Sequence, residues 1–159
     1  MKRSAGKAIL GLVLLFVVMQ VVRPAHTNPA SDPAASLRAV RPDAGPALAV
    51  LQRSCGDCHS NDTVWPWYSN VAPVSWLVAR DVRSGRRHLN ISEFGSYDAA
   101  RQQKRLTEAC SQVKEGEMPM WIYTLQHPDA TLRPGDVETI CALSETAPPT
   151  PPAASAPRP

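Results

Sequence analysis

The chain has 159 residues, of which 43% are hydrophobic, so it can form one modest domain and is neither a disordered chain nor a protein with many membrane spans. Its 17 basic residues slightly outnumber its 14 acidic residues, and three of the basic residues precede the first apolar run, so the rest of the chain has balanced charge. We expect no nucleic acid partner, because nucleic acids are usually bound by a strongly basic face.

Residues 1–24 have the pattern of a membrane-targeting segment. Lys2, Arg3 and Lys7 form a positive flank, and an uncharged apolar run follows over residues 8–22. A helix of this length, at about 1.5 Å per residue, approaches the roughly 30 Å thickness of a membrane's hydrocarbon layer. We expect a single-pass transmembrane signal anchor in the cell inner membrane, with the rest of the chain on the periplasmic side; a cleaved export signal is the alternative.

Two segments lack the periodic apolar residues of a folded core. Residues 25–42 are rich in Pro, Ala and small polar residues, so we expect a flexible linker. Residues 146–159 contain six prolines and no side chain suited to a core, so we expect a disordered tail with polyproline II character. The folded domain is expected over residues 43–145.

The apolar spacing within this domain is helical, and no segment alternates as a strand would. We expect Asp43 to cap the first helix and Gly85 to end the second. The expected helices cover residues 44–55, 73–85, 98–116 and 134–144. The predicted fold class is therefore all-α.

Cys55, Cys58 and His59 form a Cys-x-x-Cys-His motif, the pattern of c-type haem attachment. Two cysteines three residues apart on a helix can form thioethers with the two vinyl groups of one haem, and the next imidazole can then bind the iron. We expect one covalently attached haem c, with His59 as the proximal ligand, in a small helical domain like that of cytochrome c. Covalent attachment takes place outside the cytoplasm, in agreement with the targeting segment.

Two other uses of Cys55 and Cys58 fit the sequence less well. A structural zinc site needs four ligands, usually from a second close pair, whereas Cys110 and Cys141 stand 31 residues apart. A thioredoxin-like redox pair needs a preceding strand and a βαβ context, and neither is predicted.

Aromatic and basic side chains follow the motif. The aromatic residues are expected either to form a wall against a flat haem or to pack in the ordinary core; they are Trp65, Trp67, Tyr68 and Trp76. The basic cluster is expected to be a solvated helix face, a partner of the haem propionates or a surface that docks an acidic partner. It consists of Arg80, Arg83, Arg86, Arg87 and His88.

Cys110 and Cys141 lie on the apolar faces of two predicted helices, in a compartment that permits disulfides. We expect a disulfide between them, which would join the third predicted helix to the last. Two buried free thiols are the alternative.

Met118 is the candidate distal iron ligand. It follows a predicted helix end and precedes Pro119, which stiffens the turn and removes a competing amide donor. Ligation by histidine and methionine is typical of electron-carrying cytochromes c. Met120, His127 and His88 are the alternatives for this position.

Two long stretches of the chain resemble a known family. They are CGDCHSNDTVWPWYSNVAPVSWLVARDVRSGRRHLNISEF and GEMPMWIYTLQHPDATL, within residues 50–143. They resemble the haem-binding domain family of small, bacterial, membrane-anchored, c-type cytochrome-like proteins. The resemblance implies that Cys55 and Cys58 attach haem and that His59 is the proximal ligand, and it does not settle the distal ligand.

The sequence favours a membrane-anchored haem protein that carries single electrons in the periplasm and is not an enzyme. A haem-based sensor that binds a ligand is one alternative, and a peroxidase-like enzyme with His88 or His127 as acid-base group is another. The redox partner protein is unknown at this stage.

Overall fold

A computed structural model describes residues 2–146, and this part of the chain is helical without a strand. The predicted all-α class is confirmed. The helices, joined by loops and short 3-10 turns, are α1 (Lys2–Met19), α2 (Leu37–Val40), α3 (Gly45–His59), α4 (Val74–His88), α5 (Ala99–Lys114), α6 (Trp121–Gln126) and α7 (Asp136–Glu145). The proline-rich tail lies outside the described residues apart from Thr146.

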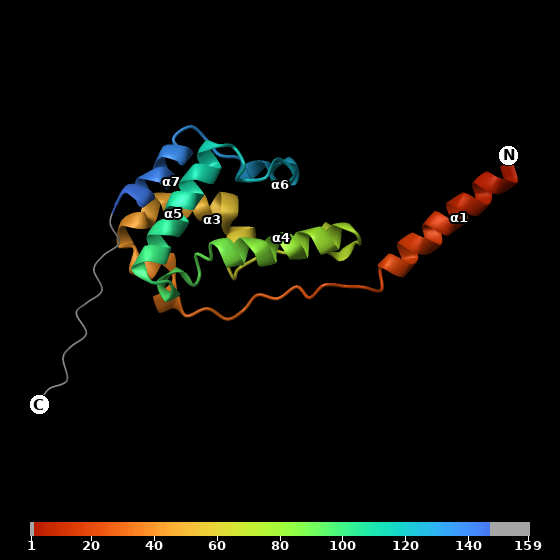
Figure 1. Cartoon of the computed structure of the whole chain (residues 1–159), viewed down its shortest axis with the longest axis horizontal. Helices are drawn as coiled ribbons and strands as arrows, with labels where there is room; N and C mark the ends of the chain where they lie inside the picture. The colour runs from red at the N-terminus through yellow and green to blue at the C-terminus, as the bar shows by residue number, and fades with distance from the viewer. Residues whose placement is uncertain (1, 147–159) are drawn as a thin grey trace, which may run out of the picture.

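The predicted transmembrane helix is not found. Helix α1 extends away from the body (Figure 1), but it ends at Met19, and its first two turns contain Lys2, Arg3 and Lys7. Across residues 2–146, no helix is long and apolar enough to span a membrane.

The body is built around α3. Helix α3 packs against α4 on one side and α7 on another, and α5 packs against α7 (Figure 1). Helices α3, α5 and α7 contribute apolar faces to one shared core, and α2 and the segment that follows α4 complete it. Its members include Leu37, Leu48, Leu51, Phe94, Leu106, Val113 and Ile140.

The folded body begins before Asp43, so the linker expected over residues 25–42 is wrong at its C-terminal end. Leu37 in α2 is fully buried, and its backbone N–H donates to the carbonyl of Ile91 at 2.8 Å. Helix α2 could not be predicted from the sequence, because four residues show too little apolar periodicity to be recognised among prolines and alanines.

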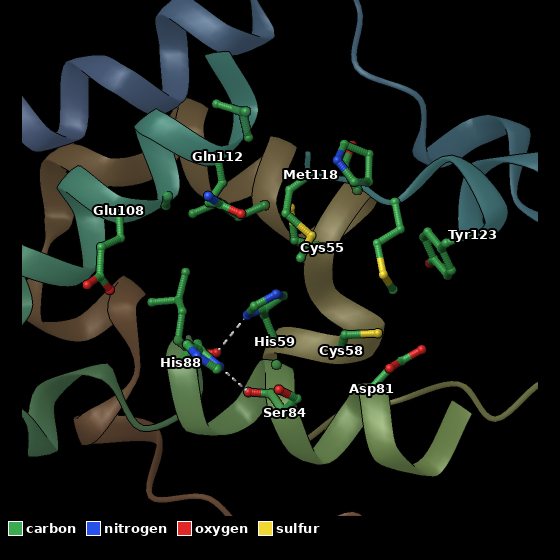
Figure 2. A pocket seen from close by; sticks show the side chains of 18 of the residues that line it. Cys55, Cys58, His59, Asp81, Ser84, His88, Glu108, Gln112, Met118 and Tyr123 are labelled. Carbon is green, nitrogen blue, oxygen red and sulfur yellow. Dashed lines mark hydrogen bonds between the residues drawn. The ribbon is translucent and has the colours of Figure 1, made fainter. Parts of the chain in front are cut away.

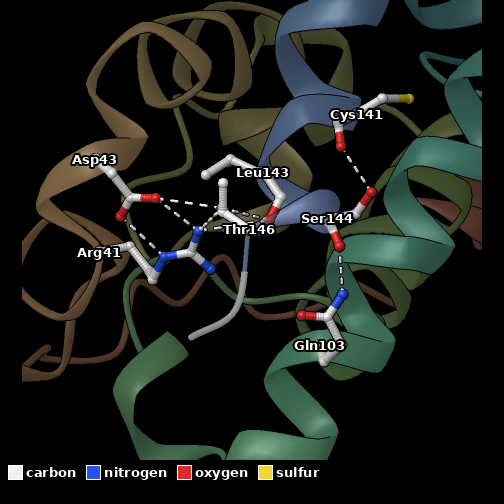
Figure 3. Close-up of polar contacts among 7 residues, drawn as sticks. All are labelled: Arg41, Asp43, Gln103, Cys141, Leu143, Ser144 and Thr146. Atoms are coloured by element: carbon white, nitrogen blue, oxygen red, sulfur yellow. Dashed lines mark hydrogen bonds and ion pairs between the residues drawn. The ribbon is translucent and has the colours of Figure 1, made fainter. Parts of the chain in front are cut away.

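Arg41 is buried and joins the start of the body to its end. Its guanidinium binds both carboxylate oxygens of Asp43, at 2.9 and 2.7 Å, and also donates to the carbonyl of Leu143 and the hydroxyl of Thr146 (Figure 3). The hydrogen bonds from Arg41 lower the pKa of Asp43. Asp43 therefore serves this ion pair and does not cap a helix, and α3 begins two residues later, at Gly45.

Residues 20–31 lie along the body and are called the strap below. Gln20 exchanges hydrogen bonds with the backbone of Ala72, and Asn28 donates to the carbonyl of Thr63 at 2.9 Å. Arg86 of α4 donates to both Thr27 and Asn28 of the strap. These contacts hold the strap against the loop that follows α3, although its composition is that of a linker.

Helix α4 runs past Gly85 to His88, so the predicted helix end at Gly85 is wrong. Gly85 lies where α4 meets the end of α3. A Cβ atom placed on it would lie 2.4 Å from the carbonyl oxygen of Cys58, too close for any side chain. The glycine thus permits close approach of two helices instead of ending one.

Replacing Gly85 with alanine should separate α3 from α4. We expect Gly85→Ala to lower the free energy of unfolding by about 1–3 kcal/mol, as overpacking does. Gly56→Ala is the matched control, because the nearest atom to its new Cβ is 3.9 Å away and alanine favours helix. Urea unfolding of both variants tests this, and a Gly85→Ala protein as stable as Gly56→Ala would contradict it.

A disulfide joins Cys110 of α5 to Cys141 of α7. The bond connects residues 31 apart in the sequence and ties together two helices that pack side by side. Closing a loop of this length restricts the unfolded chain.

Removing this disulfide should destabilise the protein. We expect the double variant Cys110→Ala, Cys141→Ala to lose roughly 4 kcal/mol of unfolding free energy, mainly through the greater entropy of its unfolded chain. Urea unfolding measures the loss, and alkylation with mass measurement counts the thiols. Alkylation of both cysteines before any reductant is added would show that the bond does not form.

Candidate functional site

A cavity of about 520 Å³ lies between α3, α4, α5 and the segment that leads into α6 (Figure 2). Its wall is mainly apolar, with Leu51, Leu89, Ala109 and Val113 among the lining residues. All three residues of the Cys-x-x-Cys-His motif line it, from the last two turns of α3. The structure therefore brings the motif into a hollow large enough for a sizeable cofactor.

His59 is held in one tautomer. Its ring Nδ1 lies 2.9 Å from the carbonyl of Leu89, and a carbonyl can only accept, so Nδ1 carries the proton. Its backbone carbonyl also accepts from Ile91 at 2.8 Å. Burial lowers the pKa of His59, which favours the neutral ring. An unprotonated Nε2 is thus available, the state that binds a metal ion.

Cys55 and Cys58 are both free and half-buried. Burial raises the pKa of Cys55 to about 11 and that of Cys58 to about 12, so both are thiols at neutral pH. Zinc binds cysteine as the thiolate, the form that this burial disfavours. Among the described residues, no three His, Cys, Asp or Glu side chains are grouped to hold a metal ion, which leaves the zinc alternative without a ligand set.

The structure separates the candidates for the distal ligand. Met118 and Met120 both line the cavity, and Figure 2 shows Met118 on the far side of the cavity from α4. His88 lines it too, on α4, with its Nδ1 bonded to the carbonyl of Ser84. His127 is not among the lining residues, and its Nε2 lies 2.7 Å from the Tyr68 hydroxyl, so the structure gives no support to His127.

The segment that carries both methionines is tied to the motif itself. The Tyr123 hydroxyl of α6 donates to Asp57, between the two motif cysteines, at 2.7 Å. The Tyr123 ring stacks on His127 at 4.4 Å, and His127 contacts Tyr68. Burial and the bond to Asp57 raise the pKa of Tyr123 well above its usual value, so it stays a donor. Nothing in the sequence singled out Asp57 or Tyr123, since they lie 66 residues apart.

Of the two alternatives for the four aromatic residues after the motif, the wall against a haem is wrong. None of the four residues lines the cavity, where the aromatic side chain is that of Tyr123. Trp65 stacks on His26 of the strap at 4.3 Å, and Trp76 donates to the carbonyl of Val22. Trp67 is 78% exposed. Two of the tryptophans therefore pack against the strap instead of a cofactor, which sequence proximity to the motif could not reveal.

The basic cluster also lies outside the cavity, apart from His88. Arg86 uses its guanidinium on the strap and on the loop after α3, where it donates to the carbonyl of Ser60 at 2.7 Å and the hydroxyl of Thr63 at 2.8 Å. Arg86 therefore joins the strap to the loop after α3 and is not part of a solvated helix face.

The lining contains polar atoms that the chain alone does not satisfy. The hydroxyl of Ser54 and the Nε of Arg105 are buried without a hydrogen-bond partner. The cavity also has an apolar wall, the two motif thiols, the neutral imidazole of His59 and the thioether side chains of Met118 and Met120. This set of groups fits a flat apolar cofactor that also carries polar groups and a metal.

A helical body with such a cavity at the end of a Cys-x-x-Cys-His helix has the features of a small haem-binding domain. Comparison with protein families agrees, because the haem-binding domain family matches residues 14–145. The chain belongs to this family, which confirms the resemblance found in the sequence and supports a haem as its cofactor. No curated protein and no solved structure matches the chain.

Removing the Tyr123 hydroxyl should loosen the methionine segment. We expect Tyr123→Phe to speed hydrogen exchange in residues 117–127 and to lower the unfolding free energy by about 1.5–3 kcal/mol, since it breaks a bond to a charged acceptor. Asp57→Ala should loosen the same segment and cost more stability, because it also removes the acceptor of the Val64 backbone N–H, and the double variant should differ little from Asp57→Ala alone. Exchange followed by mass spectrometry tests this; additive effects of the two substitutions would show that the bond is absent.

Proposed function

We propose that the protein carries one haem c and transfers single electrons. In this proposal Cys55 and Cys58 hold the haem through thioethers, His59 binds iron through Nε2, and Met118 is the sixth ligand. A bound haem would supply one-electron iron chemistry. The observation that carries the proposal is the juxtaposition, across one apolar cavity, of a tautomer-locked motif histidine and a methionine segment.

The motif residues divide the work between them. The two thioether bonds would prevent loss of the cofactor, and the backbone and ring contacts of His59 with residues 89–91 keep the imidazole in one orientation. Two hydrogen bonds to one stretch of backbone restrain His59, so little of its surroundings would have to reorganise when an electron is transferred. This rigidity suits an electron carrier better than an enzyme.

Met118 is preferred to Met120 because it is anchored. Its side chain packs against the hydrophobic core, and its backbone N–H donates to the carbonyl of Gln112 at 3.2 Å. Met120 directly precedes α6, whose Trp121 and Ile122 are exposed. An iron ligand has to keep its position through oxidation and reduction, and the anchored Met118 meets this requirement better than Met120.

We further propose that the domain works on the periplasmic side of the cell inner membrane. Covalent haem attachment takes place outside the cytoplasm, and the disulfide between Cys110 and Cys141 suits an oxidising compartment. The positive flank and apolar run of residues 1–24 support export. The redox partner would be another protein of that compartment.

Substitution of the two ligands should separate attachment from electron transfer. His59→Ala should give no stable holoprotein, because the imidazole both binds iron and orients the haem during attachment. Met118→Ala should retain covalent haem, but its iron should become high-spin and its reduction potential should fall. Optical spectra, a pyridine haemochrome assay and redox titration measure these effects.

Met120→Ala and His127→Ala are the matched controls and should keep the low-spin spectrum. If Met120→Ala changes the spectrum while Met118→Ala does not, Met120 is the sixth ligand. A wild-type protein that is high-spin in both oxidation states would favour a sensor or a peroxidase-like enzyme. If wild-type protein exported with haem-attachment machinery carries no covalent haem, the proposed function is wrong.

A further inference from the structure

The cavity has two chemically different ends. The motif cysteines lie at one end, and two side chains of α5, Arg105 and Glu108, line another part of the wall. Figure 2 shows Glu108 and Cys58 on opposite sides of the cavity, with His59 between them. A haem whose vinyl edge is attached at the cysteines would direct its opposite edge, which carries the two propionates, toward α5.

Arg105 is positioned to receive an anion there. It is the one lysine or arginine among the lining residues of the described chain. Its NH1 binds Glu108 at 2.7 Å, while its Nε is buried and has no partner. A buried donor without an acceptor is unfavourable, so an acceptor at this point would stabilise the protein. The bond to Glu108 also restrains the guanidinium.

The other charged groups at the cavity do not offer the same contact. Asp81 and Glu108 are carboxyl groups, and burial raises the pKa of Asp81. Arg86, in the cluster that the sequence singled out, is already bonded to the strap and to Ser60. Arginine also matches a carboxylate better than lysine does, because its planar fork can donate twice.

We propose that Arg105 binds a propionate carboxylate of the haem and thereby sets the orientation of the haem edge opposite Cys55 and Cys58. This inference rests on the proposed function. Arg105 then acts as a positioning residue: its positive charge, close to the haem, stabilises the reduced state relative to the oxidised state. Glu108 moderates that effect by sharing the guanidinium.

Arg105→Gln and Lys104→Gln form a matched pair for the test. Each removes one positive charge from the same turn of α5, and both residues pair with Glu108. Lys104 does not line the cavity, and its side chain is 70% exposed. The holoproteins should be compared by redox titration and by resonance Raman spectroscopy of the haem propionate bending modes.

Arg105→Gln should keep its covalent haem, shift the propionate band and lower the reduction potential, while Lys104→Gln should match the wild type in the band and nearly match it in potential. Arg105→Lys, which keeps the charge, should restore most of the reduction potential but not the wild-type propionate band.

Identical propionate bands in wild type and Arg105→Gln would overturn the proposal, as would equal shifts in the two glutamine variants. Should Arg105→Gln fail to fold, an unshifted band in Arg105→Lys overturns it as well. Absence of covalent haem from the wild type would instead contradict the proposed function.

Discussion

The close approach of α4 to the last turn of α3 is the constraint on which the site depends. Gly85 lets the α4 backbone lie against the carbonyl of Cys58, and the chain that leaves α4 then passes directly beside His59. From that position Leu89 accepts from the imidazole and Ile91 donates to its backbone carbonyl. A side chain at position 85 would push α4 away from α3, and with it the Leu89 carbonyl that fixes the tautomer of the motif histidine.

The five-residue motif is linked to two other walls of the cavity, which are α4 and the segment that contains Tyr123. Its cysteines and histidine face inward, while Asp57 faces the other way and receives the Tyr123 hydroxyl and the backbone N–H of Val64. The bond from Tyr123 to Asp57 therefore ties the methionine segment to the same turn of α3 that carries the motif histidine. Both sides of a bound haem would be held by one helix end, which limits their relative movement.

Polar contacts join the two ends of the body in addition to the core packing of Leu37 and Leu143. Arg41 binds Asp43, Leu143 and Thr146, so the segment before α3 meets the segment after α7. The strap adds a second closure through Arg86, which joins Thr27 to the loop that follows the motif. A body of this size has a small core, and the contacts of Arg41 and Arg86 supplement it together with the disulfide.

The sequence alone determined the all-α class, the Cys-x-x-Cys-His motif and the pairing partners Cys110 and Cys141, because helical periodicity, motif spacing and cysteine number are local or countable properties. It could not place the tryptophans, the strap, Tyr123 or Arg105, since each acquires its role from residues far away in the chain. Gly85 illustrates the limit: a glycine near an expected helix end has the same appearance in sequence whether it stops a helix or admits a neighbouring one. Only the packing of α4 on α3 decided between the two, because the deciding quantity is a distance between backbones that the sequence does not contain.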